Sequence, residues 1–127
     1  MSKVTVSAIQ MRCTEDINEN IKNAEKLVRE AAAKGANIIL LPELFERLYF
    51  CQERRYEYYT FAKSVDENDA VKHFCAVAKE LDIVLPISFY EKDKNKKEKK
   101  ASKKTYSSCC DNYFNFNQSF TYLCSDT

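Results

Sequence analysis

Apolar positions recur along the first 93 residues in an order that predicts alternating strands and helices. The segment 4–11 alternates apolar and polar residues and is rich in β-branched side chains, which is typical of a strand. A second strand, 38–41, is four aliphatic residues long and follows shortly after Gly35, the only glycine. Gly35 stands where the end of a helix commonly needs a positive φ. The result is a β-α-β unit, whose crossover should be right-handed.

Two amphipathic helices are expected, one before and one after the second strand in the sequence. Asp16 is placed to cap the first, and Glu19 three residues later matches a capping box. The second begins at Asp66 or Asn68. Helical spacing defines the two buried stripes, which are Ile21, Ala24, Leu27, Val28 and Ala31 in the first helix and Val71, Phe74, Ala78 and Leu81 in the second.

A third strand, 82–90, is apolar on both faces through Ile83, Val84, Leu85 and Ile87. The order β-α-β-α-β over residues 1–93 predicts the opening of a layered α/β domain. His73 falls off the stripe of the second helix, so an exposed histidine is favoured over a metal ligand.

Glu43 is the candidate catalytic residue. It follows Pro42, which ends the second strand because proline has no N–H to donate to a ladder. Ligand sites of open α/β sheets lie beyond the carboxyl ends of the strands. Apolar neighbours on both sides make Glu43 a plausible general base, and the alternative is a glutamate in an ordinary surface turn.

The segment 47–63 reads as a long loop passing into a short helix, rich in tyrosine and in both charges. Tyr49, Phe50 and Cys51 either line a pocket or pack beneath the loop, and packing is the commoner case. Arg54 and Arg55 could meet an anionic group, although a solvated position is the favoured interpretation.

Charge divides the chain into two parts. Residues 1–93 carry 13 Lys/Arg and 16 Asp/Glu, whereas residues 94–127 carry 7 and 3. The second part begins with a lysine run, 94–104, and has no legible periodicity. We expect it to be a disordered, low-complexity tail, in preference to a nucleic-acid-binding segment.

The six cysteines, at positions 13, 51, 75, 109, 110 and 124, form no Cys-x-x-Cys pair. We therefore expect free thiols and neither a metal site nor a cofactor. There is no apolar signal segment and no run of transmembrane length, so a cytoplasmic location without membrane contact is expected.

Three segments carry a resemblance to a known family: 4–11, 35–45 with its Leu-Pro-Glu-Leu-Phe junction, and 49–52. Residues 3–93 resemble the start of the nitrilase superfamily, the carbon–nitrogen hydrolases, and segment 49–52 with the first helix points to an amidase branch. The resemblance implies an αββα sandwich acting on a small amide or carbamoyl substrate. It also implies a catalytic triad in which Glu43 is general base and acid, a cysteine is the nucleophile and a lysine stabilises the oxyanion.

The lysine and the cysteine of that triad are not assigned. In the family each follows later strands than this sequence provides, and Cys51 is not at the nucleophile position. Segments 103–106 and 109–111 only faintly echo the two motifs. The resemblance ends near residue 93, which suggests a frameshift, a mispredicted splice or a truncation. We therefore expect an inactive N-terminal fragment.

An isolated half of this fold should leave one sheet face uncovered. Roughly six aliphatic side chains would stay in water, each forgoing about 1.5–3 kcal/mol. Such a chain should be marginally stable and adhesive. The uncovered face could also dock on a second copy or on a full-length homologue, which makes a non-catalytic interaction module the alternative function.

Overall fold

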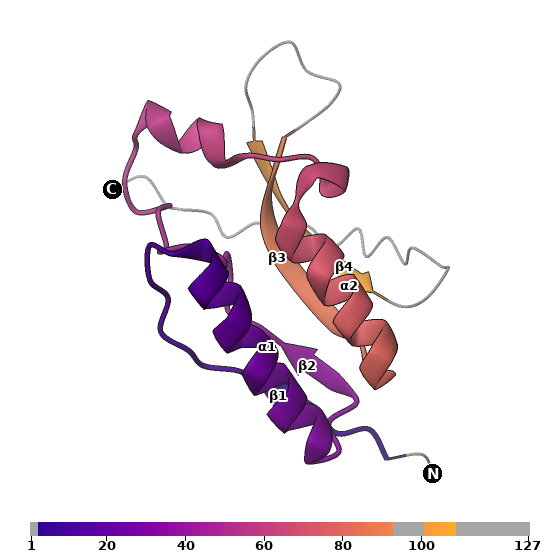
Figure 1. Ribbon diagram of the computed structural model, residues 1–127. Coiled ribbons are helices and arrows are strands. Elements are labelled where there is room, and N and C mark those ends of the chain that lie inside the picture. Colours follow the sequence, from indigo (N-terminus) through magenta and orange to yellow (C-terminus); the bar gives the residue numbers. More distant parts are fainter. Residues whose placement is uncertain (1–2, 93–100, 109–127) are drawn as a thin grey trace.

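The computed structural model describes residues 3–92 and 101–108 (Figure 1). The chain runs through β1 (Val6–Ala8), α1 (Ile17–Ala33), β2 (Ile38–Leu40), α2 (Asp69–Leu81), β3 (Leu85–Lys92) and β4 (Ala101–Ser108). Two short 3₁₀ turns, η1 (Tyr56–Phe61) and η2 (Val65–Glu67), lie between β2 and α2. The expected β-α-β-α-β order is therefore confirmed.

The strands form two ladders that meet at one isolated bridge. β1 and β2 are parallel, with Ser7 opposite Ile39, and β3 and β4 are antiparallel, with Ser88 opposite Thr105. The parallel bridge Ile38–Val84 joins the ladders through two backbone hydrogen bonds of 2.9 Å. β2 consequently lies between β1 and the start of β3.

Local sequence sets the helix ends. The Asp16 side chain caps α1 by accepting from the N–H groups of Asn18 and Glu19. The expected capping box does not form there, because the Glu19 carboxylate instead accepts from the Thr14 hydroxyl at 2.9 Å. Asn68 caps α2 by accepting from the N–H of Val71 at 3.1 Å, so that of the two expected starting residues it is Asn68 that begins this helix.

Gly35 has the positive φ expected of it, +89°. The end of α2 takes the same left-handed conformation at Asp82, with φ 52° and ψ 50°. Asp82 therefore adopts, with a side chain, a backbone conformation that favours glycine.

Both helices pack on one face of the strands, as Figure 1 shows. β3 alternates accordingly, with Leu85, Ile87 and Phe89 buried and the residues between them half-buried. The other face is open on β1 and β2, where Val4, Val6 and Leu40 are 58%, 65% and 48% exposed. The apolar pattern of these strands is thus buried on the helix-covered face only, and the uncovered face expected from the sequence is observed on β1 and β2.

β4 lies in the segment that was expected to be a disordered tail. Ala101–Ser108 pairs with β3 along its whole length, from Leu85 opposite Ser108 to Lys92 opposite Ala101. The expectation is thus wrong for these eight residues, since β3 supplies the edge on which they form a strand. The rest of the proposed tail lies outside the described residues. Over the described chain, no helix combines the length and the hydrophobicity needed to cross a bilayer.

Candidate functional site

Glu43 lies three residues after the end of β2, in a tight turn that spans residues 43–46. Its side chain is exposed, whereas the next two residues, Leu44 and Phe45, are each only 1% exposed. The turn closes with a hydrogen bond from the N–H of Arg47 to the carbonyl of Leu44 at 3.1 Å. The backbone therefore presents Glu43 outward while the following residues enter the core.

Leu44 has a left-handed backbone, with φ 53°. This conformation brings the Cβ of an L-residue close to its own carbonyl group and costs roughly 1–2 kcal/mol. Burial of the Leu44 side chain and the hydrogen bonds around the turn offset this cost. Strained backbone of this kind concentrates at functional sites.

Side chains from α1, from α2 and from the segment before α1 hold the turn. The Asn20 amide of α1 donates to the carbonyl of Glu46 at 3.0 Å, and the Cys13 thiol donates to the carbonyl of Phe45 at 3.2 Å. The Phe45 ring meets Phe74 of α2 edge to face, with 5.2 Å between centroids. The turn that carries Glu43 is thereby fixed to both helices.

Glu46 is the second carboxylate of the turn, and it is half-buried. Burial raises the pKa of the Glu46 carboxyl, and the positive charges of Arg47 and Lys63 oppose this rise. The Asn68 side-chain amide at the start of α2 also lowers the pKa. Glu43 and Glu46 therefore occupy different environments although only three positions separate them.

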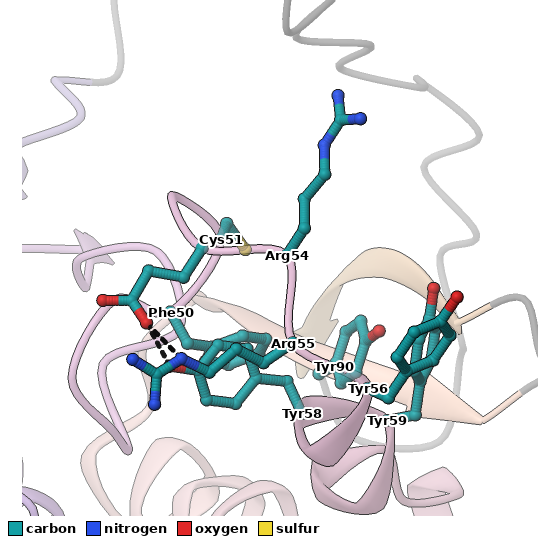
Figure 2. A pocket seen from close by; sticks show the side chains of 9 residues that line it. Phe50, Cys51, Arg54, Arg55, Tyr56, Tyr58, Tyr59 and Tyr90 are labelled. Carbon is teal, nitrogen blue, oxygen red and sulfur yellow. Dashed lines mark hydrogen bonds and ion pairs between the residues drawn. The ribbon is translucent and has the colours of Figure 1, made fainter.

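A separate pocket of about 290 Å³ lies beyond the turn, beside η1 (Figure 2). It is aromatic and basic, and Figure 2 shows Arg54 extending away from the group of rings. Arg55 is paired with Glu53 at 2.7 Å, and Glu53 also accepts from the Tyr58 hydroxyl at 3.0 Å. The pocket is lined by Phe50, Cys51, Glu53, Arg54, Arg55, Tyr56, Tyr58, Tyr59 and Tyr90.

Phe50 and Cys51 line this pocket, which is one of the two interpretations of the sequence. Phe50 also packs on Phe61 and Tyr90, in line with the other interpretation. Tyr49 lines a neighbouring hollow of about 480 Å³. Glu43 lines neither space. The candidate residues from the sequence therefore lie in two places, Glu43 in the turn and the others around the aromatic pocket and the hollow beside it.

His73 is 41% exposed, as expected, and its Nε2 lies 2.6 Å from the Glu25 carboxylate. Among residues 3–92, no group of three or more His, Cys, Asp or Glu could hold a metal ion. Cys13, Cys51 and Cys75 are free thiols. Cys109 and Cys110 lie outside the described residues, whereas segment 103–106 falls within β4.

Sequence reasoning missed Asn20, Leu44 and Glu46. Asn20 carried a visible signal, because it shares the four-residue spacing of Ala24 and Val28 on the buried stripe of α1. A polar residue on such a stripe must find hydrogen-bond partners. Leu44 carried no signal, since nothing in its sequence context marks a left-handed leucine.

The strand order and a glutamate just beyond the carboxyl end of β2 are the features that the sequence led us to expect of a carbon–nitrogen hydrolase. The exposed position of Glu43 in a turn is the alternative that the sequence left open for this residue. The sequence profile of the carbon–nitrogen hydrolase family matches residues 5–111, and the chain belongs to this family. The match extends past residue 93 and includes β4, so the resemblance covers more of the chain than the sequence suggested.

The similar curated proteins are amidases and related enzymes. N-carbamoylputrescine amidase of Oryza sativa subsp. japonica is 48% identical over 94 residues, which are 74% of this chain and 31% of that protein. N-carbamoylputrescine amidase of Arabidopsis thaliana is 48% identical over 89 residues, 70% of this chain and 30% of that protein. Citrullinase of Francisella tularensis is 39% identical over 95 residues, 75% and 33% respectively. The chain spans about a third of the length of these relatives.

Solved structures share the fold. A carbon–nitrogen hydrolase from Helicobacter pylori G27 superposes with a TM-score of 0.64 at 22% identity, over 82% of this chain and 39% of that one. An amidase from Nesterenkonia sp. gives 0.60 at 17% identity, over 82% and 37%. At these identities the similarity establishes the α/β fold and nothing further.

Proposed function

We propose that this chain is the N-terminal part of an amidase similar to N-carbamoylputrescine amidase, and that Glu43 is its general base and acid. The observation that carries the proposal is the position of Glu43 beyond the carboxyl end of β2, in a turn that two helices fix. Identity of 48% to two N-carbamoylputrescine amidases supports the choice of branch.

The chemistry follows from the family resemblance. Glu43 would take the proton of a cysteine thiol, whose thiolate attacks the carbamoyl carbon. It would then return a proton to the leaving nitrogen, and a lysine would stabilise the oxyanion. Water releases the acyl group, so that N-carbamoylputrescine and water give putrescine, ammonia and carbon dioxide. The reaction would belong to polyamine synthesis, and we place it in the cytoplasm.

Turnover is not expected from this chain alone. The proposed general base is present, but neither a nucleophilic cysteine nor an oxyanion lysine is assigned to it. The purified chain should therefore release no ammonia from N-carbamoylputrescine above a buffer control. Release that depends on Glu43 would contradict this part of the proposal.

A chimera tests the role of Glu43 directly. Residues 3–92 would replace the matching third of the Arabidopsis amidase, and ammonia release would be measured. The Glu43→Gln chimera should lose at least about a hundredfold in kcat, the lower end of what general acid–base catalysis contributes. Glu30→Gln on the exposed face of α1 is the matched control. Full activity of Glu43→Gln in a folded chimera would remove Glu43 from the mechanism.

The second candidate function is an interaction module, favoured by the exposed apolar side chains on β1 and β2. In this proposal the open face of these strands docks on a full-length homologue or on a second copy. Co-purification of the tagged chain with a full-length amidase, lost on Val6→Lys, is the expected result. Retention that is indifferent to Val6→Lys would exclude this face as the docking surface.

A further inference from the structure

Asn20 joins three pieces of backbone through one side chain. Its Oδ1 accepts from the N–H of Thr14 at 2.8 Å, and its Nδ2 donates to the carbonyl of Thr14, also at 2.8 Å. The same Nδ2 donates to the carbonyl of Glu46 at 3.0 Å, across 26 positions of sequence. The residue is 1% exposed, so water is not available to replace these partners.

The Glu46 carbonyl is a specific point of attachment. It belongs to the last residue of the turn that begins at Glu43, and the Arg47 N–H beside it closes that turn on Leu44. The Leu44 backbone is left-handed and therefore tends to relax unless its surroundings hold it. Release of the Glu46 carbonyl would remove a restraint two residues from the strained position.

Asn20 also differs from the other contacts of the turn in being directional. The Phe45–Phe74 pair and the burial of Leu44 favour any compact packing, whereas the hydrogen bond that Asn20 donates to the Glu46 carbonyl requires a specific position of that carbonyl. The Cys13 thiol donates to the neighbouring carbonyl of Phe45, but thiols are weak donors. The Asn20 amide thus links α1 to the turn through a stronger donor than the Cys13 thiol.

We propose that Asn20 is a positioning residue, which sets the direction of Glu43 by holding the carbonyl of Glu46. The proposal rests on the function assigned to Glu43 above. Asn20 does not touch the reacting atoms in this scheme. It acts through the backbone, by keeping Leu44 in the left-handed conformation that turns Glu43 outward and residues 44 and 45 inward.

The test uses the full 127-residue chain and nuclear magnetic resonance. Asn20→Asp keeps the shape and the acceptor but loses both donated hydrogen bonds, and Asn20→Ala loses the whole amide. Asn18→Asp adds the same charge at an exposed position of α1. Val77→Ala removes core volume from α2 and leaves the hydrogen bonds of Asn20 in place. It is therefore the control for a loss of global stability.

Two readouts separate positioning from general stability. A left-handed residue gives a strong nuclear Overhauser effect between its own amide and Hα protons, and both Asn20 variants should lose it at Leu44. Exchange of the Arg47 amide should accelerate about tenfold more in these variants than in Val77→Ala, as expected for a broken hydrogen-bonded turn. Asn18→Asp should leave both readouts unchanged.

The proposal fails if the Asn20 variants exchange at Arg47 no faster than Val77→Ala, or if Leu44 keeps its signature in them. It fails equally if the unsubstituted chain shows no protection of the Arg47 amide. Glu43→Gln should leave both readouts intact. A loss of activity in the Glu43 chimera and a loss of the turn in the Asn20 variants are therefore independent results.

Discussion

At the scale of single residues, the Glu43 turn separates two carboxylates by environment. The place of Glu43 beyond β2 was predictable, because a strand, a proline and a glutamate follow one another in the sequence, whereas its exposure was the alternative interpretation. The environment of Glu46 was not predictable. Its burial and its interactions with Lys63 and Asn68 arise only in the folded chain. Asn20 was predictable in part. Its place on an apolar stripe marked it as buried but did not show that it binds the Glu46 carbonyl.

The raised pKa of Glu46 gives a prediction with a definite sign. A carboxyl whose pKa is higher in the folded state binds its proton more tightly there than when unfolded. Its contribution to stability is therefore present at low pH and is lost as the pH rises through the folded pKa. Glu46→Gln should raise the free energy of unfolding at neutral pH, by about 1 kcal/mol.

Urea unfolding between pH 4 and pH 8 measures this effect. The difference between Glu46→Gln and the unsubstituted chain should shrink as the pH falls, with Glu30→Gln as the exposed control. A gain from Glu46→Gln that is independent of pH would mean that the charge of Glu46 is not its cause.

At the scale of elements, the sequence specified the helices better than the strands. Caps and stripes are local, so α1 and α2 were predicted close to their observed bounds. β4 was missed because its lysine-rich sequence lacks alternation, and the strand depends on pairing with the distant β3. Lysine is common on edge strands, where it discourages association, so the charge that suggested a tail is compatible with a strand.

The ends of the two helices make a paired prediction. Asp82 is exposed, has φ 52° and places a negative charge at the carboxyl end of α2. Asp82→Gly should therefore raise the free energy of unfolding by about 0.5–1 kcal/mol. Lys34→Gly at the end of α1, where φ is −84°, should lower it by a similar amount.

Gly35→Ala completes this comparison. No atom lies within 4 Å of the added Cβ, so strain at φ +89° is the only expected cost. Thermal melts of the three variants should place Asp82→Gly above the unsubstituted chain and the other two below it. Stabilisation by Lys34→Gly would contradict the conformational argument.

At the scale of the whole molecule, the helices cover one face of the strands and leave the other open. The sequence predicted this imbalance from the missing second half of the fold. Among the described residues, the exposed large aliphatic side chains are Val4, Val6, Leu40 and Leu48, fewer than the six expected. Three of the four lie on β1, β2 or the residues leading into β1.

Val6→Lys should reduce self-association, because it places a charge in the middle of this open apolar face. Analytical ultracentrifugation should show a larger monomer fraction than for the unsubstituted chain. Gln10→Lys, at an exposed polar position after β1, is the control that adds the same charge without removing apolar surface. Equal effects of the two variants would attribute the change to net charge alone.

The thiol of Cys13 makes the opening of the Glu43 turn chemically visible. Its hydrogen bond to the Phe45 carbonyl and a pKa raised by burial both slow its alkylation in the folded chain. Cys75 is exposed and reacts as an internal reference. The ratio of the two alkylation rates, followed by peptide mass spectrometry, would therefore record how often the turn opens, without any label having to be introduced.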